Sequence, residues 1–480
     1  MTSDARAMGR NLSLISLNKV AQLIGGVLWA LLIPRWLGPE TYGMFALAMS
    51  ISLLLWWLGD FGGLEVFGRY MPTLQERQPQ EAHELFDQFF ILRLLVAISL
   101  VPLMLVVGPL IAPWLSGWPA ALVGLSAGIH IVSWTSYHLL YARKEMGKWS
   151  TELSWRLLTQ LPLILLVGKY GLTAQMAAYA ANELIYLALG AWWTRDWFSR
   201  ALFRPHLGFL RPFLRMGAGF WVTNIGLILL FRSGTILVQL LTNNPVQVAY
   251  YDLALVVFFL VYTIIDQLVR AFLPTISQYQ EGGQKERVGY WLQMVTQWGA
   301  AQAVIAVIAV QYTARWIMPL ILGSAFAESA VVLQIMLLSL PALVLVGVGT
   351  VASAVRESAR AKLIAIGAGI VVFYGSSVFL TTRLDAVGAA WSLTLGLAVY
   401  ALVLFALVRH DLRLRWIALL GILALGVPFL AARSLVADSL LLAIGATIVA
   451  AVLYLGIALA LRLISPAPLR LLPRLIARSR

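Results

Sequence analysis

Ionisable side chains lie inside stretches of sequence that are otherwise apolar enough to cross a membrane. Lys19 and Arg232 each belong to a polar stripe of helical spacing, with Gln22 one turn after Lys19 and Gln239 two turns after Arg232. A charge at that depth costs roughly 2.5 to 3.5 kcal/mol on insertion scales, so it normally faces a bundle interior or a water-filled cavity. The alternative is a cation that pairs with a neighbouring helix or extends to the interface.

Cations in such a setting have an evident ligand chemistry. Arginine offers a planar fork and lysine a point charge to phosphate oxygens, and both contacts strengthen where the dielectric is low. Two stripes carrying Lys19 and Arg232 that face one cavity would therefore receive a diphosphate head group. The sequence predicts a cationic substrate-binding site with these four residues.

Two further arginines are candidates for the same site. Arg93 lies within about two turns of the start of its helix, so its side chain could extend to the membrane surface as readily as bind substrate. Arg156 follows Glu152 by one turn, and we expect that carboxylate to neutralise it.

Acidic residues could instead bind a coupling ion. Asp60 has no partner in its own helix and occupies a glycine-rich break, while Asp252 and Asp266 share one helical face. Any of these could bind a proton or Na⁺, although an acid at a helix end is more often solvated. Glu183 is a further intramembrane acid, to which no role is assigned.

The sequence offers little for metal, redox or covalent chemistry. The chain has no cysteine, hence no thiol nucleophile and no thiolate metal site. His130 and His138 fall in one predicted span without a third ligand at metal spacing, so we interpret them as core or interface histidines. We expect no metal, no cofactor and no catalytic residue.

The composition identifies the setting that must position these residues. Of the 480 residues, 61% are hydrophobic and 12% are charged, and the mean hydropathy is +0.85, far above that of soluble domains. A spanning helix needs about 20 mostly apolar residues. We predict an all-α polytopic membrane protein of about 14 transmembrane helices, at residues 12–34, 41–65, 86–107, 119–141, 150–168, 174–194, 216–241, 248–272, 290–311, 327–352, 361–380, 386–408, 416–433 and 439–464.

Basic residues orient these spans. Most of the 35 Lys and Arg residues fall on one side of the predicted membrane, with both termini, which the positive-inside rule makes cytoplasmic. The net charge of +14 therefore reflects cytoplasmic loops, and we expect no nucleic-acid partner. The basic and aromatic segment 195–212 is interpreted as interfacial, on anionic lipid. The other side holds only five basic residues: Arg35, Lys169, Arg315, Arg383 and Arg433.

An internal repeat predicts two similar halves. Glu65 and Arg69, one turn apart before a Pro-Thr pair, recur as Asp266 and Arg270 six spans later. Parallel repeats of this kind pack about an axis along the membrane normal with the substrate site between the lobes. We predict an ion pair within each copy and, as a hypothesis, a gating contact between the lobes on the inner side.

The repeat also divides the chain. Residues 1–215 form an N-terminal six-helix lobe with a basic linker, residues 216–412 a pseudo-symmetric C-terminal six-helix lobe, and residues 413–480 two extra helices and a basic cytoplasmic tail. No predicted outer loop exceeds about fifteen residues, too short for a catalytic domain, so we expect a protein that is not an enzyme.

The segment from Arg35 to Tyr70, with its Arg-Trp-Leu-Gly-Pro-Glu-Thr-Tyr-Gly turn and its Leu-Gly-Asp-Phe-Gly-Gly break, resembles the opening of the polysaccharide transporter family. This family comprises Wzx-type flippases for lipid-linked oligosaccharides, within the multidrug/oligosaccharidyl-lipid/polysaccharide exporter (MOP) superfamily. The resemblance implies a two-lobe, alternating-access transporter in a bacterial or archaeal inner membrane. It also implies an O-antigen or exopolysaccharide precursor on polyprenyl diphosphate as substrate, besides membrane lipids, and a polymerase and glycosyltransferases as possible partners.

Three other functions remain as alternatives. A multidrug extruder of the same superfamily should have an acidic rather than a cationic cavity. A membrane polysaccharide polymerase or ligase generally needs a long outer loop. An antiporter-like subunit of a respiratory complex would need a chain of buried Lys, His and Glu along the midplane, which the sequence does not indicate.

Overall fold

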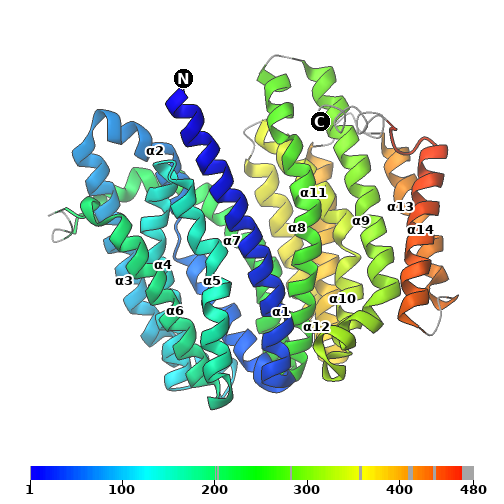
Figure 1. Ribbon diagram of the computed structural model, residues 1–480, viewed down its shortest axis with the longest axis horizontal. Helices are drawn as coiled ribbons and strands as arrows, with labels where there is room; N and C mark the ends of the chain where they lie inside the picture. Colours follow the sequence, from blue (N-terminus) through cyan, green and yellow to red (C-terminus); the bar gives the residue numbers. More distant parts are fainter. Residues whose placement is uncertain are drawn as a thin grey trace. The chain divides into compact units, whose positions relative to one another are not determined.

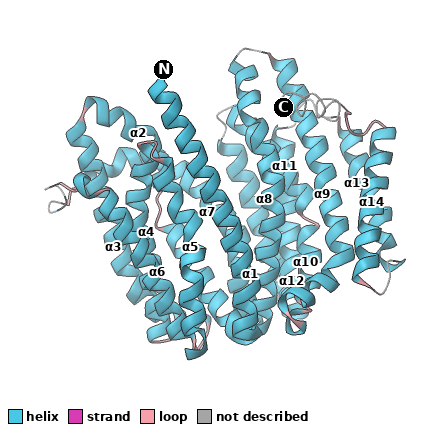
Figure 2. Cartoon of the chain, viewed as in Figure 1, coloured by secondary structure: helices cyan, strands magenta, loops and turns pink. Residues whose placement is uncertain are grey.

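The computed structural model describes residues 2–199, 202, 205–281, 284–355, 359–408, 415–435 and 439–466. Every regular element in these ranges is helical (Figure 2), which confirms the all-α class. The α-helices are α1 (Thr2–Leu58), α2 (Gly63–Arg77), α3 (Pro79–Ile111), α4 (Trp118–Ala142), α5 (Met146–Val167), α6 (Leu172–Trp193), α7 (Arg211–Thr242), α8 (Pro245–Glu281), α9 (Lys285–Leu322), α10 (Ser329–Leu337), α11 (Leu340–Val355), α12 (Ala359–Val408), α13 (Trp416–Ala431) and α14 (Leu440–Ala460). Short 3-10 turns join some of them: Gly168–Tyr170, Arg195–Trp197, Leu207–Leu210, Ser324–Phe326 and Ala432–Leu435.

The chain packs into two units, Met1–Asp252 and Leu253–Arg480. Helices α1 to α7 and the first turns of α8 form the first unit, where α7 packs against α1 and α2. The lobe boundary at residue 215 is predicted from an internal repeat, whereas these units are defined by contacts between residues. The boundary therefore stays a prediction.

A glycine interrupts the first long helix. At Gly38 the backbone has φ 76° and ψ 166°, so α1 consists of two helical segments that meet there, which agrees with the separate spans predicted at 12–34 and 41–65. The second segment ends at Leu58 and not at residue 65, so that predicted boundary is wrong. Phe61 and Gly62 adopt left-handed conformations, with φ 54° and 68°, which end the helix and let α2 begin in a new direction.

The other long helix, α12, is also broken. Asp385 has φ 50° and ψ −132° inside Ala359–Val408, which agrees with the separate spans predicted at 361–380 and 386–408. A non-glycine residue with positive φ is uncommon outside turns, so the backbone itself marks this as a connection between two spans.

The described residues contain seven helical segments long and apolar enough to cross a membrane, or eight if α10 and α11, bent by 42°, count as one span. The chain is therefore a multi-pass membrane protein. Two of the seven, Leu17–Arg77 and Arg360–Val408, contain the breaks at Gly38 and Asp385. Helices α4, α5 and α6 are not among them, because their polar side chains lower the mean hydropathy.

Small residues let helices of the first unit approach closely, as α3 and α4 do (Figure 1). A Cβ atom at Gly124 would lie 2.5 Å from the Leu100 carbonyl oxygen, and one at Gly128 would lie 2.9 Å from Ala97 Cβ. Backbone contact of this kind replaces the hydrophobic drive that is missing between helices in lipid. Aromatic packing of Trp56 and Trp134 fills the neighbouring space.

In the second unit, α13 and α14 pack against α9. Buried Ile308 of α9, Ile422 of α13 and Tyr454 of α14 belong to one apolar cluster. The Tyr454 hydroxyl donates to the Ile422 carbonyl oxygen at 2.9 Å, and that of Tyr312 donates to the Phe429 carbonyl oxygen at 2.6 Å. The two C-terminal helices are thus bound to their unit by polar as well as apolar contacts.

The closest helix approach gives a test of the packing. A Cβ atom at Gly43 of α1 would lie 1.8 Å from the Pro245 carbonyl oxygen of α8, while one at Gly26 of the same helix meets no atom within 4 Å. We predict that Gly43→Ala destabilises the protein by about 1–3 kcal/mol, since backbone must move to admit the methyl group. Gly26→Ala should leave the melting temperature in detergent unchanged or slightly higher. Equal melting temperatures for the two variants would contradict this packing.

Candidate functional site: buried ion pairs of the first unit

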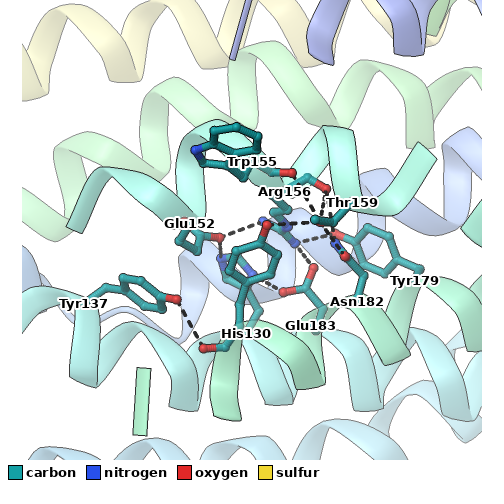
Figure 3. Close-up of polar contacts among 10 residues, drawn as sticks. His130, Tyr137, Glu152, Trp155, Arg156, Thr159, Tyr179, Asn182 and Glu183 are labelled. Atoms are coloured by element: carbon teal, nitrogen blue, oxygen red, sulfur yellow. Dashed lines mark hydrogen bonds and ion pairs between the residues drawn. The ribbon is translucent and has the colours of Figure 1, made fainter. Parts of the chain in front are cut away.

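Four ionisable residues from three helices meet in the interior of the first unit (Figure 3). We call His130 of α4, Glu152 and Arg156 of α5, and Glu183 of α6 the α4–α6 cluster. Three of them are almost completely buried, and the Arg156 side chain is 14% exposed. Charges so deep in a membrane bundle must be paired to be tolerated.

Arg156 lies between the two carboxylates of the α4–α6 cluster. One guanidinium nitrogen is 3.4 Å from Glu152 Oε1, and the other donates to Glu183 Oε1. The predicted neutralisation of Arg156 by Glu152 is thereby confirmed, and Glu183 is a second partner that helical spacing could not indicate. A guanidinium with its five donors is suited to such double contact.

His130 completes the cluster on the side of α4. Its Nδ1 is 2.6 Å from Glu183 Oε2, and its Nε2 is 3.9 Å from Glu152 Oε1. Both histidines of α4 are buried, as predicted, but His130 contacts two acids and so is more than a packing residue.

Neutral polar groups fix the arrangement around Arg156 (Figure 3). The Tyr179 hydroxyl accepts from Arg156 Nη2 at 2.9 Å. One turn away, Thr159 Oγ1 donates to Asn182 Oδ1 at 2.8 Å and lies 3.0 Å from the Tyr186 hydroxyl. Because Tyr179, Asn182 and Tyr186 share one face of α6 with Glu183, the polar surfaces of α5 and α6 match over two turns.

A second group of charges, the Arg93 cluster, joins the break after α1 to α3 and α4. Arg93 has no exposed surface. Its Nη2 donates to the Asp60 carboxylate at 2.7 Å and to the Asp60 carbonyl oxygen at 2.8 Å, and its Nη1 donates to Thr135 at 3.2 Å. A Cβ atom at Gly63 would lie 2.1 Å from Nη2, so the glycine-rich break makes room for the guanidinium.

The partner of Arg93 on α4 must be neutral in this arrangement. Nη2 of Arg93 is 3.2 Å from Nδ1 of His138, and a guanidinium can only donate. Both N–H groups of Nη2 point mainly to Asp60, so His138 Nδ1 is a weaker third acceptor that shares one of them. Nδ1 carries no proton of its own, and the proton resides on Nε2, which lies 3.7 Å from Asp60 Oδ1. The Arg93 cluster has one cation and one anion.

Aromatic rings separate the two clusters along α4. The ring of Trp134, one turn after His130 and one before His138, lies 5.7 Å and 4.9 Å from their ring centroids. Trp56 of α1 packs on His130 at 4.1 Å. No direct hydrogen bond between the clusters is found among the described residues.

A third ion pair contains two of the predicted site residues. Arg232 Nη1 of α7 lies 3.7 Å from Asp252 Oδ1 of α8, and the Arg232 side chain is 25% exposed. The Tyr42 hydroxyl of α1 donates to the other oxygen of Asp252 at 3.0 Å. We call these residues the Arg232 triad. It brings together the predicted phosphate-binding arginine and a predicted ion-coupling acid.

The remaining residues of the predicted cationic site differ in accessibility. Lys19 is exposed and donates to Gln22 Oε1 at 3.1 Å, so this stripe presents polar groups outward. Gln239 is only 1% exposed, and its amide donates to Asn243 Oδ1 at 3.1 Å. Contact of Gln239 or Arg93 with a substrate would require another conformation, because neither is accessible here.

The predicted pair of Glu65 and Arg69 is wrong. In the described part of the chain Glu65 has no ion-pair partner; its Oε1 accepts from Asn224 of α7 at 3.3 Å, and Arg69 is exposed. The two side chains diverge because Glu65 faces α7 while Arg69 lies on the outer side of α2. The side chains of Asp266 and Arg270 lie outside the described residues, so the second copy of this prediction is not tested.

Sequence reasoning missed the contacts that span helices. The sequence indicated no buried assembly of His and Glu, yet His130, Glu152 and Glu183 meet around one arginine. The available signal was the rule that an intramembrane charge has a partner. This rule required a partner for Glu183 but could not identify it.

Comparison with known proteins identifies the fold. A family described as polysaccharide biosynthesis protein matches residues 8–280. The lipid II flippase MurJ in an inward closed conformation has a TM-score of 0.73 at 14% identity, with 92% of this chain and 98% of that chain covered. An inward-facing multidrug resistance MATE family transporter of the MOP superfamily has a TM-score of 0.67 at 15% identity, with 84% and 98% covered. An outward-facing structure of a multidrug resistance MATE family transporter of the MOP superfamily has a TM-score of 0.53 at 16% identity, with 84% of this chain and 96% of that chain covered. No curated protein sequence matches the chain.

The Arg93 cluster makes a prediction about stability. Arg93→Met leaves the Asp60 carboxylate buried without its cation, which should cost about 3–5 kcal/mol and lower the melting temperature in detergent by roughly 6–20 °C, at 2–4 °C per kcal/mol. Combining it with Asp60→Asn should recover most of the loss, since no buried charge then remains. Arg215→Met, at an exposed arginine of α7, is the control. A melting temperature of Arg93→Met equal to that control would contradict the pairing.

Proposed function

Because this chain belongs to the polysaccharide biosynthesis protein family, we propose that it is a flippase for a polyprenyl-diphosphate-linked oligosaccharide. It moves this lipid from the cytoplasmic to the outer leaflet of the cell membrane by alternating access. The observation that carries the proposal is the family match, which covers more than half of the chain. The glycan belongs to O-antigen, lipopolysaccharide or exopolysaccharide synthesis, so a polysaccharide polymerase and glycosyltransferases are its expected neighbours in the pathway.

The fold supports transport without selecting the substrate. It resembles both a lipid II flippase and multidrug transporters, so a multidrug extruder remains the second candidate. The family match favours the lipid-linked sugar. The cationic side chains of Lys19 and Arg232 point the same way, since a site for cationic drugs needs acid.

We propose fourteen spans for the membrane topology. Helices α1 and α12 contribute two spans each, on either side of Gly38 and Asp385; α10 and α11 together form one; and α3 to α9, α13 and α14 form one each. The first six and the next six would be two pseudo-symmetric lobes of residues 1–215 and 216–412, followed by two extra helices in 413–480. Both termini are then cytoplasmic, in accord with the positive-inside rule.

The substrate diphosphate is received by the cationic residues, chiefly Lys19 and Arg232. Arg232 is held by Asp252 before substrate arrives, and a diphosphate offers more charge and more acceptor oxygens than one carboxylate. On binding, the substrate diphosphate thus replaces the Asp252 carboxylate as the partner of Arg232. Glu65, whose Oε1 accepts from Asn224 of α7 at 3.3 Å, remains a proposed gating residue through that contact rather than through Arg69.

Direction can come from the membrane potential. If two negative charges cross without compensation, an inside-negative potential of 100 mV favours export by about 2.3 kcal/mol per charge. We predict that collapsing the potential in proteoliposomes, with all ion gradients fixed, slows outward flipping. An unchanged rate would remove the potential as a driving force.

Removal of the Arg232 charge tests the site. A charge-assisted hydrogen bond is worth about 1.5–3 kcal/mol, so Arg232→Gln should slow flipping roughly ten- to a hundredfold per folded molecule. Rates are normalised to the folded protein, because the substitution also leaves Asp252 without its cation. Arg383→Gln removes a cation of α12 whose guanidinium packs on Phe379 at 3.9 Å and should flip like the wild type. Normal flipping by Arg232→Gln would exclude Arg232 from the site.

A further inference from the structure

The α4–α6 cluster has one more acid than it has permanent cations. Arg156 contacts both Glu152 and Glu183, but it can cancel only one of these charges. The fourth member, His130, is the one group whose charge changes near neutral pH. With a neutral imidazole the cluster has a net charge of −1, and with an imidazolium it has none.

Two other groups of paired charges among the described residues of the first unit are already balanced. In the Arg93 cluster one guanidinium faces one carboxylate, and His138 accepts a hydrogen bond and so is neutral. In the Arg232 triad, Asp252 is matched by Arg232. Of these three groups, only the α4–α6 cluster needs an additional positive charge to be neutral.

A proton fits this need better than a metal cation does. The position between the two carboxylates is taken by the Arg156 guanidinium, which would repel Na⁺. No group of three or more His, Cys, Asp or Glu residues in the described part of the chain could hold a metal ion. One ring nitrogen of His130 is open, since Nε2 has no hydrogen-bond partner within the described residues and lies 3.9 Å from Glu152.

We propose that the α4–α6 cluster is a proton-binding site, with His130 Nε2 as the acceptor, and that flipping is coupled to its protonation. This deepens the proposed function by naming the coupling ion. On protonation the imidazolium donates from Nδ1 to Glu183 and from Nε2 toward Glu152. On deprotonation the proton leaves Nε2 to water and the cluster returns to its uncompensated charge.

The surroundings of His130 specify how the event affects the helices. From α5 it faces Glu152 and Arg156, and from α6 it faces Glu183. From α1 the Trp56 ring packs on it, and along α4 itself Trp134 separates it from His138 and the Arg93 cluster beyond. The hydroxyls of Tyr179 and Tyr186 face Arg156 and Thr159 rather than the imidazole.

A proton on Nε2 therefore acts between particular elements. It adds an attraction between His130 of α4 and Glu152 of α5. Glu152 then has a second cation beside it and depends less on its ion pair with Arg156. The packing of α4, α5 and α6 then has two states that differ by one proton, which a transport cycle can use.

The binding step can be tested without any transport. Proton NMR of the Cε1 positions of the five histidines, in the full chain in detergent, follows each imidazole between pH 5 and 9. We expect one signal, absent from His130→Gln, to change with pH in this range and to respond differently to pH in Glu183→Gln, which removes the acid bound to Nδ1. A His130 signal that does not change between pH 5 and 9 would overturn the proposal.

Coupling is tested in proteoliposomes with the potential clamped by K⁺ and valinomycin. The probe is a short polyprenyl-diphosphate-linked oligosaccharide with a fluorescent sugar. One pH unit across the membrane is equivalent to a tenfold ratio per proton, so imposing it should change wild-type flipping severalfold. His130→Gln should flip at a rate that does not respond to the gradient.

The control is a histidine that also faces a carboxylate but is exposed. His206 Nδ1 lies 3.6 Å from Glu84 Oε1 on the surface, and His206→Gln should respond to the gradient like the wild type. A wild-type response to the gradient in His130→Gln would overturn the proposal. Glu65 is a further acid to test, because its Oε2 is buried without a hydrogen-bond partner among the described residues. Loss of the response in Glu65→Gln together with a wild-type response in His130→Gln would also overturn the proposal. Absence of wild-type flipping would instead count against the proposed function, and the NMR titration would still decide proton binding.

Discussion

The cost of an unpaired charge in a low-dielectric interior organises the first unit. Three cations of the described part of the unit each have an anion within reach, and the pairs join separate elements: Arg93 with Asp60 of the break after α1, Arg156 with Glu183, and the partly exposed Arg232 with Asp252. Breaking one such pair costs several kcal/mol because the survivor stays buried. The pairs therefore specify which helices are neighbours and in which register, a task that apolar surfaces cannot perform alone in lipid.

The same constraint explains where the backbone departs from regular helix. The glycine-rich break after α1 places the Asp60 carbonyl and carboxyl groups on one guanidinium and leaves room for it at Gly63. In α4, Trp134 lies one turn after His130 and one turn before His138, so its ring separates the polar contacts of the two histidines.

Much of the fold could be predicted from the sequence because its signals are local. Apolar runs predicted the helices, and the gaps between the predicted spans 12–34 and 41–65 and between 361–380 and 386–408 predicted connections near Gly38 and Asp385. Helical spacing gave the Glu152–Arg156 contact. The same spacing rule failed for Glu65 and Arg69, since a tertiary contact with Asn224 takes the carboxylate elsewhere.

The rest could not be predicted because its partners are distant in sequence. Nothing in the spacing of Asp60 and Arg93, or of His130 and Glu183, indicates that they meet; each was recognised only as an intramembrane charge that must have some partner. Function divides likewise. The family match identifies a polysaccharide biosynthesis protein. The fold resembles those of a lipid flippase and a multidrug transporter, so it does not specify the substrate. The charged side chains must therefore supply substrate specificity.

The most direct test of that choice is a flipping measurement on two lipids that differ only in the link between sugar and polyprenol. Reconstituted protein should flip the diphosphate-linked oligosaccharide and leave an uncharged polyprenyl-linked analogue in its original leaflet. Equal rates for the two lipids, or export of a hydrophobic cation in preference to both, would contradict a site built to receive an anionic head group.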